Sequence, residues 1–255
     1  MHQNKTSITP LISIITPTFN SLKFIDQTVE SVISQSYSNW EWIIVDDFSI
    51  DGTRDYLTNL SKRDSRIKTI LQDKNNGTAV ARNTALHQAK GKYIAFLDSD
   101  DLWHSKKLYK QVNFMLENDI AFSFCQYRII NENGSHTDKL IKIPEQIDYN
   151  GLLKNTIIGC LTVMIDVEKT GKFKMPNLRT RQDFVLWLSI LKKGFSAYGI
   201  QEELAYYRKV NGSISSNKIK AAKMNWRVYR NIEKLSLPKS AWCFFNYAWN
   251  AYKKN

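Results

Sequence analysis

Three carboxylates follow a short apolar run in the middle of the chain, where Tyr93–Leu97 leads directly into Asp98-Ser99-Asp100-Asp101. The apolar run is typical of a buried strand. Side chains at positions i and i+2 of an extended chain point the same way, so we expect Asp98 and Asp100 to share one side and Ser99 to point away. Two neighbouring carboxylates raise each other's pKa unless a cation lies between them. Mg²⁺ and Mn²⁺ prefer carboxylate and phosphate oxygens, so the spacing predicts a metal and phosphate site. The alternative is a solvated turn that caps the next helix.

The elements that would position these acids alternate between strand and helix. Buried strands are expected at 11–15, 40–45, 66–71 and 92–97, and helices at 24–35, 53–62 and 78–89. This order predicts an α/β fold with a mostly parallel sheet, in which ligands bind beyond the carboxyl ends of the strands. Three strand ends carry polar groups, at Thr16–Asn20, Asp46-Asp47 and Asp98–Asp101. Capping residues explain one such end more easily than three together, which favours a ligand site.

The second half of the chain is less regular. The stretch at 151–169 mixes short strand and helix patterns and does not predict either clearly. The segment 179–183 leads into a strongly apolar helix. The other expected elements are a helix at 105–117, a strand at 120–130, a hairpin or mobile loop at 131–144, a helix at 184–191, strands at 195–200 and 205–210, and helices from about 216 that are broken near Pro238.

The composition suits one α/β domain or one domain with an appended segment. Hydrophobic residues make up 43% of the 255 residues, which is enough to build a core. The three cysteines lie far apart and the four histidines show no metal-binding spacing, so a disulfide framework and a structural zinc site are not expected, and a reducing compartment fits. We also expect no signal peptide and no membrane-spanning segment.

Positive charge is concentrated near the C-terminus. The formal net charge is +12, and residues 218–255 contain nine Lys or Arg and one acid, Glu233. The same segment is rich in aromatic residues at 241–252. Trp and Tyr favour the bilayer interface, and Lys and Arg are attracted to anionic lipid, so the segment predicts peripheral contact with an anionic membrane. The alternatives are packing on the rest of the protein or on an identical subunit in a homodimer.

The motifs, taken in order, resemble family 2 glycosyltransferases with the GT-A fold, a Rossmann-like sheet flanked by helices. The resemblance covers about residues 11–210. Within the family, the chain is similar to bacterial enzymes that build the repeat units of O-antigen and related surface polysaccharides. It implies a glycosyltransferase domain at 1–215, with a nucleotide-binding half at about 11–101, an acceptor half at about 102–215 and a helical extension at 216–255. The matching segments are Ser13–Asn20, Ser34–Tyr37, Trp42–Thr53, Gly77–Asn83 and Asp98–Asp100.

The resemblance also implies roles for individual residues. Phe19 would stack on uracil, where the family often has tyrosine, and Asp47 would accept a hydrogen bond from the uracil N–H. Asp46 would support Asp47 or only cap a turn. Arg82 would meet the pyrophosphate, unless it lies on a solvated helix face. The remaining nucleotide contacts implied are Pro17, Asn20, Asn76, Asp98 and Ser99.

Asp100, together with Asp98, would hold Mn²⁺ or Mg²⁺, while Asp101 would be a helix cap or support the ligands. Asp183 matches the family's base position as Gln182-Asp183 and would remove the proton from the acceptor hydroxyl, a step worth roughly 10²–10⁴-fold. Its alternative role is to stabilise a helix N-terminus. Arg179, Arg181 and Gln182 would contact a diphosphate or the acceptor, or the two arginines would simply be solvated.

These roles imply a single in-line displacement with inversion and no covalent intermediate. The donor would be a UDP-sugar, with UDP-glucose as first choice, and the acceptor a GlcNAc- or GalNAc-diphosphate-polyprenol at the cytoplasmic face of a bacterial plasma membrane. Three other functions stay open. A sugar-1-phosphate nucleotidyltransferase would need a Gly-rich loop, which Thr16–Asn20 lacks. A nucleic-acid-binding protein would carry basic residues at its ligand edge, where this chain carries acids. An inactive scaffold would not need the set Asp98, Asp100 and Asp183.

Overall fold

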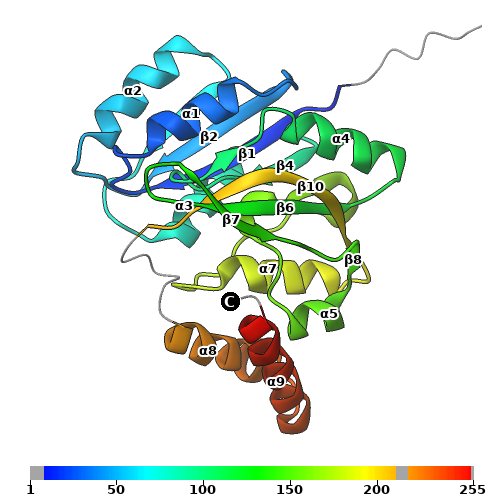
Figure 1. Cartoon of the computed structure of the whole chain (residues 1–255). Helices are drawn as coiled ribbons and strands as arrows, with labels where there is room; N and C mark the ends of the chain where they lie inside the picture. The colour runs from blue at the N-terminus through cyan, green and yellow to red at the C-terminus, as the bar shows by residue number, and fades with distance from the viewer. Residues whose placement is uncertain (1–8, 211–217, 254–255) are drawn as a thin grey trace, which may run out of the picture.

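The computed structural model describes residues 9–210 and 218–253. A single twisted sheet lies at the centre of the molecule, with strands in the order β3-β2-β1-β4-β9-β6-β10-β5, β7 beside β6 and β8 beside β10 (Figure 1). The strands are β1 Ile12–Thr18, β2 Trp40–Asp46, β3 Ile67–Leu71, β4 Tyr93–Phe96, β5 Leu102–Trp103, β6 Phe122–Ile130, β7 His136–Ile141, β8 Gln146–Ile147, β9 Met164–Asp166 and β10 Ala197–Arg208.

The helices connect and cover these strands. They are α1 Ile25–Ile33, α2 Thr53–Arg63, α3 Thr78–Gln88, α4 Lys107–Glu117, α5 Tyr149–Lys154, the short 3₁₀ turn η1 Cys160–Thr162, α6 Val167–Thr170, α7 Gln182–Leu191, α8 Lys218–Arg227, the π-helical turn η3 Val228–Ile232 and α9 Leu237–Lys253. The bounds expected for the first half of the chain are confirmed to within a few residues.

The four strands of the first half, β3, β2, β1 and β4, pair in parallel. Their carboxyl ends therefore meet at one edge of the sheet, as the alternation of strand and helix predicts. The second half introduces antiparallel strands, because β9 runs between β4 and β6 in the opposite direction to both.

Two hydrophobic clusters cover the two faces of the sheet. Ile14 and Ile44 pack with α1, α2 and α4 on one face, whereas their neighbours Ile15 and Ile43 pack with α3, α5 and α7 on the other. Successive side chains of a strand point to opposite faces, so strands buried on both sides need the continuous apolar runs seen in this sequence. Figure 1 shows α1, α2 and α4 above the sheet and α5 and α7 below it.

The segment expected as two strands at 195–200 and 205–210 is one long strand, β10. It stays paired in parallel with β6 from end to end, with shifts of register at Ile200/Glu203 and at Glu203/Ala205. An extra residue in one strand bends it without breaking the sheet. The hairpin expected after β6 is confirmed, because β6 and β7 pair antiparallel.

The C-terminal helices cover one side of the body with one face and leave the other face open. Tyr229 and Cys243 are buried in the cluster that also contains α5 and α7, and the Tyr229 hydroxyl donates to the Leu153 carbonyl at 2.6 Å. The predicted break is confirmed, because the helices are separated at 233–236 and Pro238 lies in the first turn of α9, where proline is tolerated. None of the helices in the described ranges combines the length and apolar character that crossing a membrane requires.

Candidate active site

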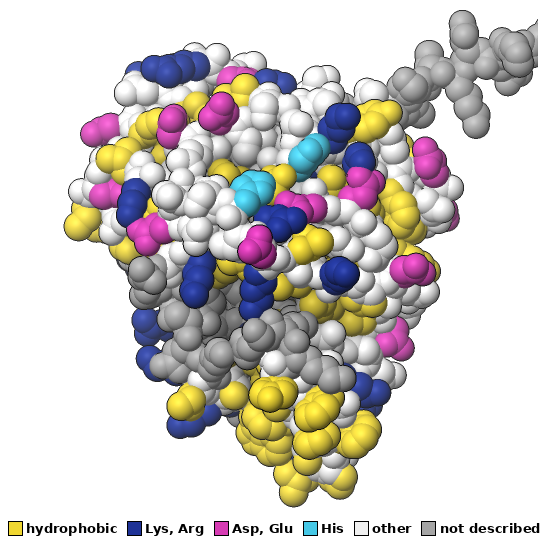
Figure 2. Space-filling view, viewed as in Figure 1, with side chains coloured by type: hydrophobic (Ala, Val, Ile, Leu, Met, Phe, Trp, Pro, Cys, Tyr) yellow, Lys and Arg dark blue, Asp and Glu magenta, His cyan; other side chains and the backbone are white. Residues whose placement is uncertain are grey.

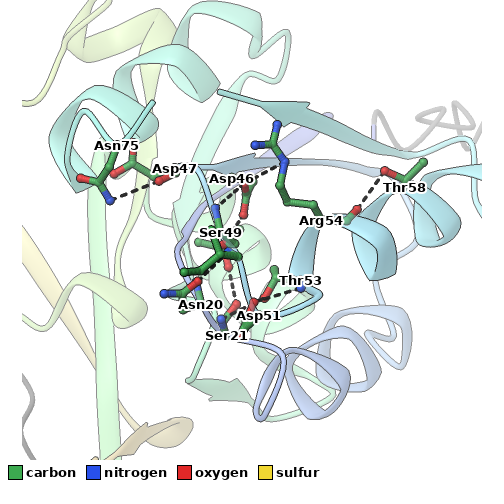
Figure 3. Close-up of polar contacts among 12 residues, drawn as sticks. Asn20, Ser21, Asp46, Asp47, Ser49, Asp51, Thr53, Arg54, Thr58 and Asn75 are labelled. Carbon is green, nitrogen blue, oxygen red and sulfur yellow. Dashed lines mark hydrogen bonds and ion pairs between the residues drawn. The ribbon is translucent and has the colours of Figure 1, made fainter. Parts of the chain in front are cut away.

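The loops after β1 and β2 hold each other in a fixed arrangement at the carboxyl edge of the sheet (Figure 3). The Asn20 N–H donates to the Ser49 hydroxyl at 2.8 Å, and the Asn20 side-chain oxygen accepts from the Ile50 N–H at 2.9 Å. Asp46 is fully buried and accepts from the Ser49 N–H and hydroxyl, with Arg54 3.7 Å away. These contacts agree with the second of the two roles expected for Asp46, which is to cap a turn, because its carboxylate accepts hydrogen bonds from Ser49 in the loop that follows it.

Two aromatic rings remain at the surface of these loops. Phe19 is 50% exposed and Phe48 is 42% exposed. The Arg54 guanidinium lies 5.6 Å from the centre of the Phe48 ring. The family resemblance implies a stacking role for Phe19 and none for Phe48, although the Phe48 ring directly follows Asp47. The edge of the sheet thus offers two flat apolar surfaces beside buried polar groups.

Asp47 ties β2 to the loop that precedes α3. Its two carboxylate oxygens accept the backbone N–H of Asn76 at 2.7 Å and of Gly77 at 2.8 Å. Its side chain is almost completely buried, so both oxygens are held in place and keep one further lone pair each for an N–H donor. The side chain of Asn76 turns back onto Gln72 and Lys74 of its own loop. Pro17 is buried within β1 opposite Val45, beneath this edge.

Arg82 lies inside the protein rather than on a solvated face of α3, so that alternative is wrong. It is 5% exposed, its Nη2 pairs with the Asp98 carboxylate, and its Nε has no partner within the described residues. Burial opposes the charged form, but the charges of Asp98 and Asp183 outweigh it and raise the pKa of Arg82. The guanidinium therefore stays positive between two carboxylates that come from different parts of the chain.

The four residues 98–101 form a turn and not a continuation of the strand. Strand β4 ends at Phe96, and the Asp101 N–H donates to the Asp98 carbonyl at 3.2 Å. The prediction that side chains alternate here as in an extended chain is therefore wrong. Within this turn, burial and the charge of Asp98 raise the pKa of Asp100 to about 6.

Two distant side chains hold this turn. The Thr28 hydroxyl lies 3.0 Å from the carbonyl oxygens of both Ser99 and Asp101. Arg208 donates its backbone N–H to the Asp101 carboxylate at 2.8 Å and its Nε–H to the Asp100 carbonyl at 2.7 Å. Asp101 therefore supports the turn, and it is not a helix cap because α4 begins only at Lys107. Sequence reasoning missed Thr28 and Arg208, which carry no motif.

The acids fit a divalent cation that also binds a substrate. No group of three or more His, Cys, Asp or Glu side chains that could hold a metal exists within residues 9–210 and 218–253. Mg²⁺-type sites commonly use one or two carboxylates and take their other ligands from water and substrate phosphates. Asp100 forms no ion pair with a basic side chain of the described chain, so its carboxylate is the group that a cation would stabilise most.

Asp183 lies in the first turn of α7, beside the same arginine. It is half-buried, and within the described residues its carboxylate accepts no hydrogen bond. The residue before the helix, Arg181, has a left-handed backbone (φ 64°) and reaches the hydroxyl of Tyr247 in α9 at 3.3 Å. Gln182 is buried with an unpartnered Oε1, whereas Arg179 is exposed.

Cys160 is a further residue of the site that sequence reasoning missed. It is buried in η1, and Arg82, Asp98 and Asp183 all act on its charge. Burial raises the pKa of its thiol well above the usual range, so the thiol stays protonated and is a poor nucleophile. It lies in the stretch at 151–169 that the sequence specifies poorly, and its spacing to other residues gives no signal.

The comparisons with known proteins agree with this geometry. The family described as "Glycosyl transferase family 2" matches residues 13–175. TuaG of Bacillus subtilis (strain 168), whose name assigns it to teichuronic acid biosynthesis, is 58% identical over 96% of this chain and 97% of its own. WfgD of Escherichia coli, a UDP-Glc:alpha-D-GlcNAc-diphosphoundecaprenol beta-1,3-glucosyltransferase, is 45% identical over 86% of this chain and 85% of its own.

The fold is also found in a solved structure of low sequence identity. The mannosyltransferase PcManGT from Pyrobaculum calidifontis, solved with GDP-Man and Mn²⁺, superposes with a TM-score of 0.70 at 17% identity, over 93% of this chain and 68% of that one. This likeness concerns the fold alone, which is the GT-A arrangement expected from the motifs. With the family match covering the strand ends and the acidic turn, and relatives of this identity over nearly the whole chain, the protein belongs to glycosyl transferase family 2 and is a glycosyltransferase.

Proposed function

We propose that this enzyme transfers a hexose from a UDP-sugar, with UDP-glucose as first choice, to a GlcNAc- or GalNAc-diphosphate-polyprenol during synthesis of a bacterial surface polysaccharide. The donor and acceptor classes are those printed in the name of WfgD, and TuaG acts by its name in a related pathway. The observation that supports the proposal most is the buried Arg82, which pairs with the Asp98 carboxylate and whose pKa is raised by Asp98 and by Asp183 from a separate element.

The donor nucleotide occupies the edge built by the loops after β1 and β2. Phe19 offers an exposed ring for stacking on uracil, and Asp47 has fixed oxygens that accept from the uracil N–H. Asn20 keeps the loop of Phe19 in place, and Ser99 belongs to the turn that faces the ribose. The buried Arg82 keeps its positive charge, which attracts the diphosphate.

Asp183 removes the proton from the acceptor hydroxyl as that oxygen attacks the anomeric carbon. The displacement is in line and inverts the configuration, so an α-linked donor gives a β-linked product. Arg82 stays protonated throughout, because Asp98 and Asp183 raise its pKa, and it therefore holds charge but moves no proton. A bound Mn²⁺ or Mg²⁺, with Asp100 as its direct ligand and Asp98 beside it, would supply Lewis-acid stabilisation of the departing UDP. PcManGT, which shares the fold, was solved with Mn²⁺.

A screen of UDP-sugars tests the proposal. Purified full-length enzyme is incubated with Mn²⁺, with GlcNAc- and GalNAc-diphosphate-lipid analogues, and with each UDP-sugar in turn, and released UDP is measured. We expect the fastest acceptor-dependent release with UDP-glucose, and loss of release when EDTA removes the metal. Release that does not depend on any diphosphate-lipid acceptor would refute the acceptor class, and release that is insensitive to EDTA would refute the metal.

The acceptor is in the membrane, and we propose that α9 brings the enzyme to it by peripheral contact. Trp242, Phe245, Trp249 and Tyr252 lie three or four positions apart and are 51–75% exposed, so they form one stripe of the helix. Figure 2 shows hydrophobic side chains gathered at the lower end of the molecule, where Figure 1 places α9, with Lys and Arg around them. No Asp or Glu occurs between Leu237 and Lys253.

Sedimentation with anionic phosphatidylglycerol vesicles tests this contact. The triple variant Trp242→Ser, Phe245→Ser, Trp249→Ser changes only exposed rings and is expected to stay in the supernatant while the parent sediments. Equal sedimentation of the two proteins would refute the membrane role. A homodimer that uses the same stripe is the competing explanation, and sedimentation velocity without vesicles would reveal it as a dimer that the triple variant converts to a monomer.

A further inference from the structure

A groove between α8 and α9 has no role in the site described so far. It has a volume of about 680 Å³, within the range of roughly 300–1,000 Å³ typical of ligand pockets. Trp226 and Phe244 form its aromatic walls, with ring centres 5.6 Å apart and planes at 89°. The residues that line it are Ile219, Ala222, Lys223, Trp226, Arg227 and Phe244.

The groove is apolar inside and carries positive charge, without an acid, among its lining residues. Lys223 and Arg227 are exposed on α8, and the remaining lining residues are hydrophobic. This combination matches an amphiphile with an anionic head and a hydrocarbon tail, since the tail is removed from water and the head meets the two cations. A second copy of the chain would bring the same charges together and is disfavoured, because like charges repel across an interface.

A row of side chains runs from the groove to the start of α7, the helix that carries the proposed base Asp183. The Phe244 ring lies 6.0 Å from the Tyr247 ring, and the Arg181 guanidinium lies 6.0 Å from the same Tyr247 ring. Arg181 directly precedes helix α7, which carries Asp183 in its first turn. From Asp183 to the groove, the order is therefore a carboxylate, the Arg181 guanidinium, the rings of Tyr247 and Phe244, and the apolar groove.

We propose that the groove binds the isoprenoid chain of the lipid-linked acceptor, with Arg181 and the two cations of the groove, Lys223 and Arg227, on the side of its diphosphate. The order of chemical groups along such a lipid is sugar, diphosphate and hydrocarbon, which is the order of the side chains from Asp183 to Trp226. The inference rests on the acceptor class in the proposed function. It differs from the membrane contact of α9, because the stripe that includes Trp242 and Phe245 lines no part of the groove.

Equilibrium dialysis with farnesyl diphosphate, a short isoprenoid diphosphate, tests the groove without any sugar transfer. Ala222→Trp places a large side chain into the hollow, and Ala248→Trp places the same side chain on an exposed part of α9 outside it. We expect Ala222→Trp to weaken binding of farnesyl diphosphate about tenfold, which corresponds to losing the burial of two methylene-sized groups. Ala248→Trp should bind like the parent, and inorganic diphosphate should bind all three proteins equally and more weakly.

Three outcomes would overturn the proposal. Farnesyl diphosphate that binds no more tightly than inorganic diphosphate would leave only an anion site. Equal binding by the parent and Ala222→Trp would place the lipid elsewhere. A dimer that dissociates only in Ala222→Trp, seen by sedimentation velocity, would make the groove a contact between copies. UDP binding measured on the same samples separates this test from the proposed function, because a protein that binds UDP and not farnesyl diphosphate refutes the groove alone.

Discussion

Replacing Arg208 by methionine tests whether the acidic turn is held in place from a distant strand. The Arg208 side chain is almost fully buried and makes three hydrogen bonds, from Nε to the Asp100 carbonyl at 2.7 Å, from Nη1 to the Glu132 carbonyl at 2.8 Å and from Nη2 to Gln27 Oε1 at 2.7 Å. Methionine has a similar length and no donor. The substitution therefore keeps most of the packing and removes all three bonds.

The size of the effect follows from these contacts. Each buried acceptor left without a donor costs about 1–3 kcal/mol, and removing the charged member of a buried network typically costs about 3–5 kcal/mol in total. We therefore expect urea unfolding to show a loss of about 3–5 kcal/mol. A catalytic group displaced by about 1 Å can lose roughly 10²-fold in rate, and we expect that loss in UDP release, with a higher Mn²⁺ concentration needed for half-maximal activity.

Arg128→Met is the matched control. Arg128 lies on β6 and pairs with Glu203 at 2.6 Å, but both side chains are 24% exposed and neither contacts the turn. Water can replace that ion pair, so the expected loss is about 1 kcal/mol or less, with unchanged dependence on Mn²⁺. If Arg208→Met lost stability but kept the parental Mn²⁺ dependence at a temperature where it is fully folded, Arg208 would be a structural residue only and the positioning role would be refuted.

Three further predictions concern the base, the nucleobase and a buried lysine. Asp183→Asn should leave UDP binding unchanged and lower transfer about 10²–10⁴-fold, and transfer at the parental rate would exclude Asp183 as the base. Phe19→Ala should weaken UDP binding roughly tenfold or more by calorimetry, because a stacked base contributes about 1–3 kcal/mol, whereas Tyr109→Ala, equally exposed on α4, should not. Burial lowers the pKa of Lys107 to about 8, so between pH 8 and 10 the unfolded chain holds a proton that the folded chain releases, and stability from this residue rises by about 1.4 kcal/mol per pH unit. Lys107→Met should remove that rise in urea titrations, and an identical slope in both proteins would contradict the lowered pKa.

The sequence predicts which strand ends meet at the candidate site better than how the side chains there are held. Strand ends at Asp46 and near Asp98 follow from buried apolar runs, because parallel strands must present their carboxyl ends at one edge. The conformation of the acidic turn does not follow, because it depends on Thr28 and Arg208, which are about 70 and 107 positions away. Local spacing contains no information about a partner that only the tertiary fold brings close.

The same limit explains the error at 195–210 and the alternative that the sequence left open for Arg82. A break in the apolar pattern after Ile200 predicts two strands, whereas the register with β6 absorbs the extra residues as bulges and keeps one strand. Arg82 on an Ala-rich helix reads equally well as a solvated or a buried residue. The choice depends on Asp98 and Asp183, which compensate its charge from other elements.

The three carboxylates of the acidic turn have different partners. The Asp101 carboxylate accepts the backbone N–H of Arg208, and the Asp98 carboxylate forms an ion pair with Arg82. Both side chains therefore contribute to holding the structure. Burial and Asp98 raise the pKa of Asp100 to about 6, and burial, Asp100 and Asp98 raise the pKa of Asp101 well above its usual range. Asp101 accepts a backbone N–H, whereas no basic side chain in the described ranges forms an ion pair with Asp100. A nucleoside diphosphate adds further negative charge beside it, which the single positive charge of Arg82 cannot balance. A divalent cation bound at Asp100, as proposed above, would resolve both deficits together, so we expect metal and donor to bind this enzyme cooperatively, each more tightly in the presence of the other.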